Sequence, residues 1–471
     1  MEKNETNKTI LIVVIAIIAL CGCITVSCCA FTFYALSHID KNKVGEFVSN
    51  APIDSEIETI LSAEHPEDPE PETGGETELT ADGLTAEELK IIQLTEETRG
   101  ITAETKLAPI YKTTEELRQD MIEQLQEATD EELADELGLY NILGFAPEDF
   151  DLRQFYVDLY TEQIAGFYDP DENAMYLITD IDPRENALTL AHEYTHYLQY
   201  NYEPFDEVLN YDDDFCKENG ETCIVINALI EGDASLTENL LDVEETVLKA
   251  PDDQSGEAAS SGVFDNAPKF FQDSLLFPYI YGFDFVAYHY LKGGFDAVND
   301  LFINLPESVE QIMHPEKYLK DSPVSVTLEP FRSMIAGNFE IVQEDVLDEA
   351  DIMELLGSGY DTEWQLSERQ AAAGAEGWGG GSYIFARSEG KPLFFSKVIW
   401  DSEDEAKEAE TTFSMYSDKR FGNRNDGSFW QAADGSVAYL IRQGDVLYWM
   451  ILPDNFEADT LVETILHGSA L

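Results

Sequence analysis

The residues best suited to chemistry are His192, Glu193 and His196, which spell H-E-x-x-H within the text ENALTLAHEYTHYLQY. The first and fifth positions of this motif share one face of a helix, so both imidazoles can reach a single Zn2+ ion. The carboxylate beside the first histidine can then hold and activate a water molecule. The spacing therefore predicts a metal-dependent hydrolytic site. The simpler alternative is a pair of partly buried histidines on an ordinary helix.

A zinc site of this kind needs a third protein ligand, and the sequence offers Glu231. It is the one charged residue between Cys223 and Asp233, in an otherwise apolar stretch. Burying a carboxylate there is costly unless the carboxylate meets a cation or another partner. We therefore expect His192, His196 and Glu231 to hold Zn2+. The alternative for the glutamate is a position at the edge of a helix.

Peptide hydrolysis also needs a hydrogen-bond donor for the oxyanion that develops on the substrate. Tyr281, in the aromatic segment FPYIYGFDFVAYHYL, and His314, which precedes Pro315, are the best candidates. Most of the aromatic segment should be core, and His314 can alternatively cap a helix. Together with Glu193, these two residues complete the predicted catalytic set.

These motifs resemble the gluzincin group of zinc metallopeptidases. The chain is also similar to a largely uncharacterised family of exported prokaryotic proteins with AGFYDP, AHExTHxLQ, EGDA, PYxYG and HPEKY segments. The matching residues are 165–170, 191–199, 231–234, 278–282, 314–318, 377–380 and 399–403. The resemblance covers about residues 110–471, and it implies a zinc metallopeptidase that acts on a peptide or protein substrate.

The resemblance also concerns the surroundings of the metal. A gluzincin carries an aspartate four residues after its glutamate ligand, where this chain has Ser235, so Asp233 or Glu238 would have to orient the first histidine. The strand at 174–179 would be the edge strand that pairs with an extended substrate. Small residues such as Gly232 should let the Glu231 helix lie close to the metal-binding helix.

Helices and short strands must position these residues. The text from 113 to 144 is amphipathic at helical spacing, and Thr113 or Thr114 should begin its first helix. Towards the C-terminus we expect a hairpin turning at 388–391, a helix beginning after Asp401 or Ser402, two further hairpin-linked strands and a last helix.

The predicted fold class is α+β. We expect a mainly helical, zincin-like metallopeptidase domain with a small sheet at 106–355, followed by a small α+β domain at 358–471. The second domain should fold independently and support substrate capture, because Trp378 lies in a glycine-rich, exposed-looking stretch.

The N-terminal residues decide the expected compartment. A short tail, 1–9, precedes an uncharged apolar run at 10–36, which predicts a transmembrane helix. The acidic text at 44–105 predicts a disordered stalk. We expect a single-pass cell-membrane protein with its C-terminal domains outside the cytoplasm. A cleavage box of lipoprotein type at 20–23 is a weaker alternative. In an exported protein, Cys216 and Cys223 can form a disulfide or stay as free thiols.

Charge excludes one class of partner. The chain has 95 acidic against 27 basic residues and a net charge of -68, which argues against general nucleic-acid binding because such binding needs clustered Lys and Arg. The sequence thus favours a membrane-anchored, extracytoplasmic zinc-dependent metallopeptidase. The alternative is a surface binding or adhesion protein on a zincin scaffold, with structural metal or none.

Overall fold

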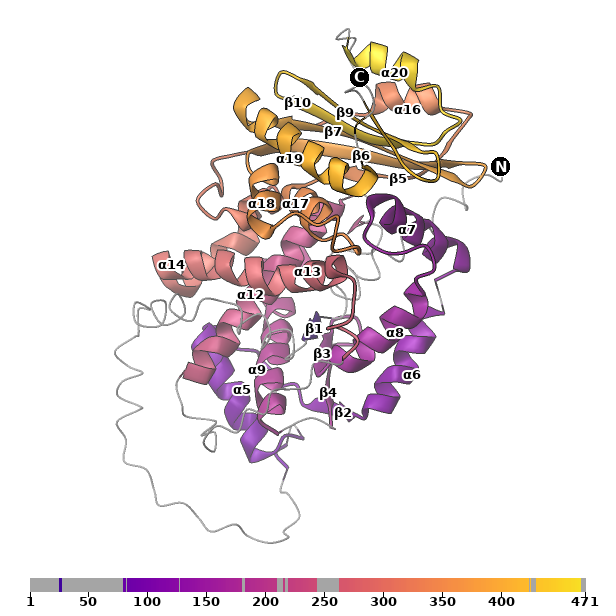
Figure 1. Cartoon of the computed structure of the whole chain (residues 1–471). Helices are drawn as coiled ribbons and strands as arrows, with labels where there is room; N and C mark the ends of the chain where they lie inside the picture. The colour runs from indigo at the N-terminus through magenta and orange to yellow at the C-terminus, as the bar shows by residue number, and fades with distance from the viewer. Residues whose placement is uncertain are drawn as a thin grey trace, which may run out of the picture.

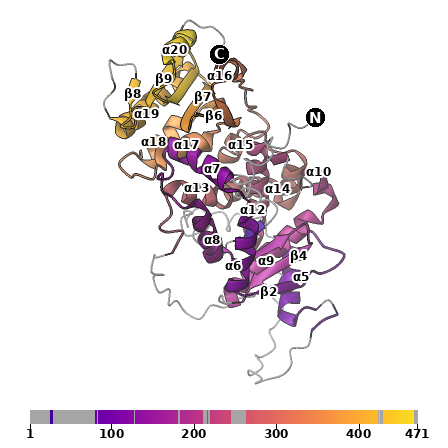
Figure 2. The ribbon, with the colours of Figure 1, turned by 90° about the vertical axis from the view of Figure 1, so that its right-hand side faces the viewer.

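The computed structural model describes residues 25–27, 79–81, 83–126, 128–179, 183–209, 215–216, 219–243, 262–422, 424 and 429–466. The fold is α+β, and Figures 1 and 2 show a C-terminal sheet with its helices stacked on a larger, mainly helical part. The helices of this larger part are α5 (Ala86–Arg99), α6 (Thr114–Leu125), α7 (Asp130–Leu143), α8 (Leu152–Gln163), α9 (Pro183–Tyr200), η1 (Glu203–Phe205), α10 (Asp206–Leu209), α12 (Gly220–Val243), α13 (Lys269–Phe277), the π-helical turn η2 (Pro278–Gly282), α14 (Phe283–Ile303) and α15 (Val309–Met313).

A four-stranded sheet supports the helical part. Its strands are β1 (Thr25–Ser27), β2 (Pro109–Lys112), β3 (Gly166–Asp169) and β4 (Ala174–Ile178), in the order β1-β3-β4-β2. Strands β3 and β4 form an antiparallel hairpin, and β2 runs parallel to β4. Strand β4 is therefore paired on both sides. The expectation that residues 174–179 form a free edge strand is wrong.

The predicted transmembrane helix at 10–36 is also wrong as a description of the fold. The part of this segment that the structure describes, Thr25–Ser27, is strand β1, which pairs antiparallel with β3. Thr25 and Val26 are β-branched and so favour extended backbone. No helix in the described ranges is long and apolar enough to cross a membrane. The rest of 10–36, the tail 1–9 and residues 44–78 of the expected stalk lie outside the described residues.

Helix α5 lies inside the segment expected to be a disordered stalk. Thr85 caps it through a reciprocal capping box with Glu88, and Gly100 ends it in a left-handed conformation. Ile91 and Ile92 are buried, and the helix packs against α9 and α12. This stretch is therefore part of the folded unit that carries the H-E-x-x-H motif.

The C-terminal part is built on an antiparallel sheet in the order β5-β6-β7-β10-β9-β8. Its elements are α16 (Glu329–Ile335), β5 (Glu340–Val346), α17 (Glu349–Gly357), α18 (Glu368–Ala375), β6 (Trp378–Ser388), β7 (Lys391–Trp400), α19 (Glu403–Phe421), β8 (Phe429–Gln431), β9 (Val437–Gln443), β10 (Val446–Leu452) and α20 (Ala458–Leu466). The expected hairpin at 388–391 is confirmed, and Ser402 is the cap of α19.

Helices cover both faces of this sheet. Side chains of α16 and α20 share one hydrophobic cluster with one face, and α19 packs into the larger cluster on the other face. Because β5 pairs with β6, the sheet begins upstream of residue 358. The larger hydrophobic cluster contains side chains from both parts of the protein, from α6 in the helical part to β10 in the sheet. Arg420 of α19 also donates hydrogen bonds to backbone carbonyls of α7. The two parts therefore share one core.

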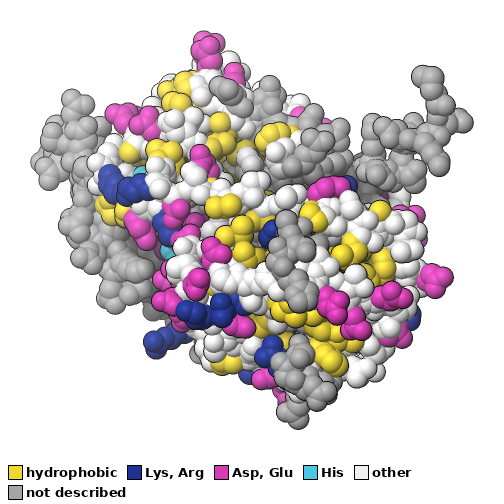
Figure 3. Space-filling view, turned by 90° about the horizontal axis from the view of Figure 1, so that it is seen from above, with side chains coloured by type: hydrophobic (Ala, Val, Ile, Leu, Met, Phe, Trp, Pro, Cys, Tyr) yellow, Lys and Arg dark blue, Asp and Glu magenta, His cyan; other side chains and the backbone are white. Residues whose placement is uncertain are grey.

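The C-terminal part buries Trp378 and carries charges of both signs on the face seen from above (Figure 3). Trp378 is 1% exposed and donates a hydrogen bond to the Leu347 carbonyl at 2.8 Å, so the expectation of an exposed tryptophan is wrong. Seen from above, acidic side chains are scattered over this face, and Lys and Arg occur in small groups among them (Figure 3).

Candidate metal centre

Helices α9 and α12 bring the three expected ligands together. His192 Nε2 lies 3.1 Å from Glu231 Oε2, and His196 Nε2 lies 3.7 Å from the same oxygen. One ligand atom from each residue lies within 4.8 Å of the other two, and all three side chains are buried. Glu193, the predicted base, follows His192 on α9 and is also fully buried. The one-face argument from the spacing therefore describes the site well.

Glu238 holds the outer nitrogen of His192, that is, the ring nitrogen Nδ1 that faces away from Glu231. Its Nδ1 lies 3.0 Å from Glu238 Oε2, and Glu238 is buried on α12 two turns after Glu231. A carboxylate in this place fixes the ring orientation and leaves Nε2 directed at Glu231. Of the two residues considered for this role from the sequence, Glu238 is the one that contacts His192.

His196 is held by a longer chain of contacts, which the sequence did not reveal. Its Nδ1 lies 2.9 Å from Gln199 Oε1, and Gln199 Nε2 donates to Asp233 Oδ2 at 2.9 Å. Arg99 of α5 donates to the same aspartate oxygen through Nε at 2.9 Å. The spacing of three residues between His196 and Gln199 was a usable signal. Nothing local marked Arg99, because its role depends on where α5 packs.

The aromatic segment reaches the site through a residue that was not predicted. The hydroxyl of Tyr279, in η2, donates a hydrogen bond to the carboxylate of Glu231. Tyr281 is half-buried, and its hydroxyl faces Met353 Sδ at 3.9 Å. His314 Nε2 lies 3.0 Å from Glu349 Oε1 at the start of α17. The oxyanion role of Tyr281 and His314 stays a prediction, and these contacts give both residues another partner.

Close backbone packing places Tyr279. A Cβ atom on Gly232 would lie 2.3 Å from the carbonyl oxygen of Gly282, and one on Gly282 would lie 2.2 Å from the carbonyl oxygen of Ala228. Both positions therefore require glycine. The small residue Gly232 lets α12 approach η2 closely, and α12 also packs against α9 as we expected. Because Gly282 is the last residue of η2, this contact holds the turn against the face of α12 that carries Glu231.

The protonation states follow from burial and these contacts. Burial alone would lower the pKa of His192, but its hydrogen bonds to Glu231 and Glu238 outweigh burial and raise the pKa to about 10. Burial, and then the neighbouring His192, lower the pKa of His196 well below its usual value. Burial raises the pKa of Glu231, although His192 and Tyr279 act in the opposite direction. At neutral pH, His192 therefore carries a proton, and a metal cation would compete with this proton for the ring nitrogen.

The residues present fit a divalent metal. His196 Nε2 is buried and has no hydrogen-bond partner among the described residues, and it faces the shared glutamate. Two imidazoles and one carboxylate form a donor set typical of catalytic zinc, with a position left for water or substrate. The outer nitrogens of both imidazoles are already engaged, as is usual for metal-bound histidine.

A second acidic group does not need a metal. Glu310, Asp321 and Asp401 lie close enough to share a cation. The ammonium of Lys317 already lies 2.6 Å from Glu310 and 3.5 Å from each aspartate. This group is therefore an ion-pair network that links the segment after α15 to the C-terminal sheet.

A disulfide lies at the start of α12, the helix that carries Glu231. Cys216 and Cys223 are bonded, which decides between the two alternatives left open by the sequence. Cys223 belongs to the first turn of α12, so the bond ties the preceding loop to this helix. Disulfides of this kind persist in oxidising compartments.

Comparison with known proteins reaches only the C-terminal part. The family described as "Domain of unknown function (DUF8575)" matches residues 335–461, from the end of α16 into α20. This match covers the six-stranded sheet and none of the metal-site residues. No curated protein and no solved structure matches the chain.

Proposed function

We propose that this protein is a metal-dependent peptidase in which His192, His196 and Glu231 hold Zn2+. The observation that carries the proposal is the convergence of both Nε2 atoms on Glu231 Oε2, with each Nδ1 engaged by a separate partner. Such a metal would polarise a substrate carbonyl and increase the acidity of water.

Glu193 is the proposed general base. A water oxygen attacks the scissile carbonyl carbon, and Glu193 accepts the proton that the water loses. Glu193 then delivers this proton to the departing amide nitrogen as the C–N bond breaks, so the products are a carboxylate and an amine. Its place beside His192, on the helix that bears both histidines, supports this role. The hydroxyl of Tyr279 helps to fix Glu231 during the reaction.

The proposed setting is outside the cytoplasm. The Cys216–Cys223 disulfide supports this, because reducing compartments keep thiols free. The large acidic excess would also keep such a protein soluble in an ionic medium.

The decisive experiment is the Glu193→Gln variant. We expect it to keep its zinc content and melting temperature but to lose peptide hydrolysis by several orders of magnitude, because it removes the base and the proton carrier. Glu97→Gln, at an exposed position of α5, is the matched control and should remain fully active. Zinc content and chelator-sensitive cleavage of a peptide library measure the difference. A fully active Glu193→Gln enzyme would end this proposal.

One observation favours a second candidate, a surface binding protein with structural metal. His192, Glu193 and His196 are all 0% exposed, as expected for a site that need not admit substrate. In that case Glu193→Gln would leave every assay unchanged, and Glu231→Gln would lower the melting temperature together with the zinc content. The same two variants therefore separate the two functions.

A further inference from the structure

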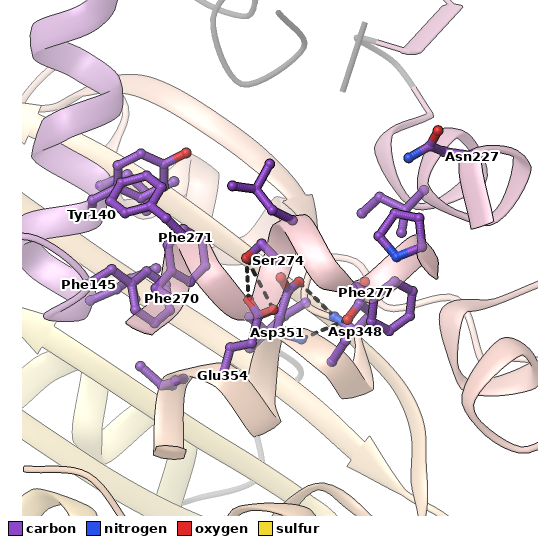
Figure 4. A pocket seen from close by; sticks show the side chains of 18 of the residues that line it. Tyr140, Phe145, Asn227, Phe270, Phe271, Ser274, Phe277, Asp348, Asp351 and Glu354 are labelled. Carbon is purple, nitrogen blue, oxygen red and sulfur yellow. Dashed lines mark hydrogen bonds between the residues drawn. The ribbon is translucent and has the colours of Figure 1, made fainter. Parts of the chain in front are cut away.

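A large aromatic cavity lies between the helical part and the C-terminal sheet (Figure 4). Its walls come from α7, α8, α12, α13, α17 and the sheet, and the side chains are mostly apolar, including Tyr140, Phe145, Phe270 and Phe271. The volume of the cavity is about 230 Å³. An apolar cavity of about 150 Å³ suffices to bind benzene, so this one has room for an aromatic ring and a short chain.

One end of the cavity is acidic. Asp348, Asp351 and Glu354 lie at or next to the first turn of α17, and all three contribute to its lining. Asp348 and Asp351 cap each other through backbone N–H groups at 2.8 and 3.1 Å, and Glu354 accepts a hydrogen bond from Ser274 at 3.0 Å. Within the described residues, none of the three carboxylates forms an ion pair.

A second polar group lines the cavity from α12. Asn227 is 7% exposed, and its Oδ1 has no hydrogen-bond partner in the described part of the chain. Figure 4 shows its amide projecting from the helix towards the other lining side chains. A buried amide oxygen without a partner loses free energy relative to one in water. Asn227 therefore offers a ligand an acceptor that the protein itself leaves unused.

We propose that this cavity binds a primary amine carried on an aromatic or similarly sized apolar body. The apolar body would fill the aromatic part, and the ammonium group would lie among Asp348, Asp351 and Glu354. An apolar pocket with a few convergent polar groups is the usual form of a small-molecule site. An ammonium supplies donors to the carboxylates, and the aromatic walls also favour a cation.

Two further observations agree with a cationic group. Burial raises the pKa of Asp348 to about 7 and the pKa values of Asp351 and Glu354 well above their usual values. A bound cation would offset this electrostatic cost. Metal binding is less suitable, because these three carboxylates do not converge as the metal ligands do within the described residues.

The cavity is separate from the metal centre but shares a wall with it. Tyr279 lines the cavity and donates to Glu231, and Asn227 lies one helical turn before Glu231 on α12. The proposal does not rest on the peptidase function, because binding can be measured without turnover. Two sources share the ligand chemistry: a free amine, or the terminal amino group of a peptide that begins with an aromatic residue.

The test is calorimetric titration of the full-length protein with 2-phenylethylamine and with its neutral counterpart 2-phenylethanol. We expect the amine to bind at least about tenfold more tightly, and 3-phenylpropionate not to compete with it. Asp351→Asn keeps a capping acceptor and should remove this preference while the alcohol still binds, which also shows that the cavity is intact. Glu408→Gln, exposed on α19, is the charge-matched control. Equal binding of amine and alcohol, or binding of neither, would overturn the proposal.

A second comparison separates the two sources. A tripeptide that begins with phenylalanine is titrated in its free and N-acetylated forms. Binding of the free form alone, lost in Asp351→Asn, assigns the site to a peptide terminus. If 2-phenylethylamine binds with the expected preference and neither tripeptide does, the site belongs to small amines. Tighter binding of the acetylated form would contradict the ammonium position.

Discussion

Two groups of buried acids lie on either side of Tyr279, and they are stabilised in different ways. At the metal centre, Glu231 and Glu238 contact His192, and Asp233 pairs with Arg99. Around the aromatic cavity, Glu136 and Glu354 accept hydrogen bonds from neutral hydroxyl groups. Glu231, Glu238 and Asp233 thus each have a basic partner, and Glu136 and Glu354 have none among the described residues.

The difference shows how a buried carboxylate can be tolerated. A basic partner opposes the effect of burial on the carboxylate and fixes its geometry, as a ligand site requires. Without such a partner, burial raises the pKa and the group tends to hold a proton, as for Glu136 at about 7. The first arrangement should fail when the base is removed. The second should fail, if at all, when the acid ionises.

The largest effect is expected for Arg99→Met, which removes the base behind Asp233. Arg99 and Asp233 are both fully buried, so the variant leaves an uncompensated charge, and we expect a loss of about 3–5 kcal/mol in the free energy of unfolding. Denaturant titration measures it. Lys391→Met, in the exposed pair with Asp454, is the control and should cost less than about 1 kcal/mol.

A double variant sharpens this test. Arg99→Met with Asp233→Asn removes both charges and should recover much of the lost stability. If the free energy of unfolding of Arg99→Met alone is within about 1 kcal/mol of the native value, the buried acids of the candidate metal centre do not depend on basic partners such as Arg99.

The next effect concerns Glu136, on the cavity side. Burial raises its pKa from 4.5 to about 7, although Tyr156 and Tyr140 donate hydrogen bonds that act in the opposite direction. Between these values the folded state holds a proton that the unfolded chain has lost. The free energy of unfolding should therefore fall as the pH rises from 4.5 to 7, by roughly 3 kcal/mol for this group.

The variant Glu136→Gln cannot ionise, so it should lose this part of the pH dependence. We expect it to match the native protein near pH 4.5 and to be the more stable of the two at pH 8. Denaturant titrations at both pH values measure the difference, with the exposed Glu123→Gln as control. A variant that is less stable than the native protein at pH 8 would show that Glu136 is ionised and useful there.

The sequence predicted the parts of this comparison that depend on local spacing. The H-E-x-x-H helix and the lone charge of Glu231 predicted the three residues of the candidate metal centre, because helical periodicity fixes which side chains share a face. The role of Arg99 could not be predicted, because the neighbouring residues are acidic and polar and its burial depends on contacts with residues far along the chain. The cavity could not be predicted for the same reason, since its walls come from segments that meet only in the folded protein.

Two expectations failed because local composition has more than one structural cause. The apolar run at 10–36 has a transmembrane composition, yet Thr25–Ser27 form a strand. The glycines after Trp378 suggested an exposed loop. Instead, Cβ atoms on Gly380 and Gly381 would lie 2.2 and 2.3 Å from the carbonyl oxygens of Val324 and Leu347. These glycines allow close backbone packing over a buried tryptophan.

A smaller effect is expected at Glu238, which holds the outer nitrogen of His192. Glu238→Gln keeps a hydrogen-bond acceptor but loses the charge that fixes the ring and raises its basicity. We expect a 10- to 100-fold loss of zinc affinity, measured by competition with a chromophoric chelator. Glu203→Gln, at the exposed start of η1, is the control. Unchanged affinity would mean that backbone packing alone orients His192.

The smallest effect is expected on the cavity side, for Ser274→Ala. The hydroxyl of Ser274 donates to both oxygens of Glu354, at 3.1 and 3.0 Å, and is the side-chain donor that this buried acid has among the described residues. Burial keeps the pKa of Glu354 well above its usual value of 4.5, so the carboxyl is protonated at pH 4 and the bond lost there is one between neutral groups. Such a bond contributes about 1 kcal/mol, so denaturant titration should show a loss of that size. Ser333→Ala, exposed on α16, should change nothing. A loss of 3 kcal/mol or more would be the cost of an unpaired buried charge. It would place an ionised Glu354 in the cavity and remove the difference between the two sides of Tyr279.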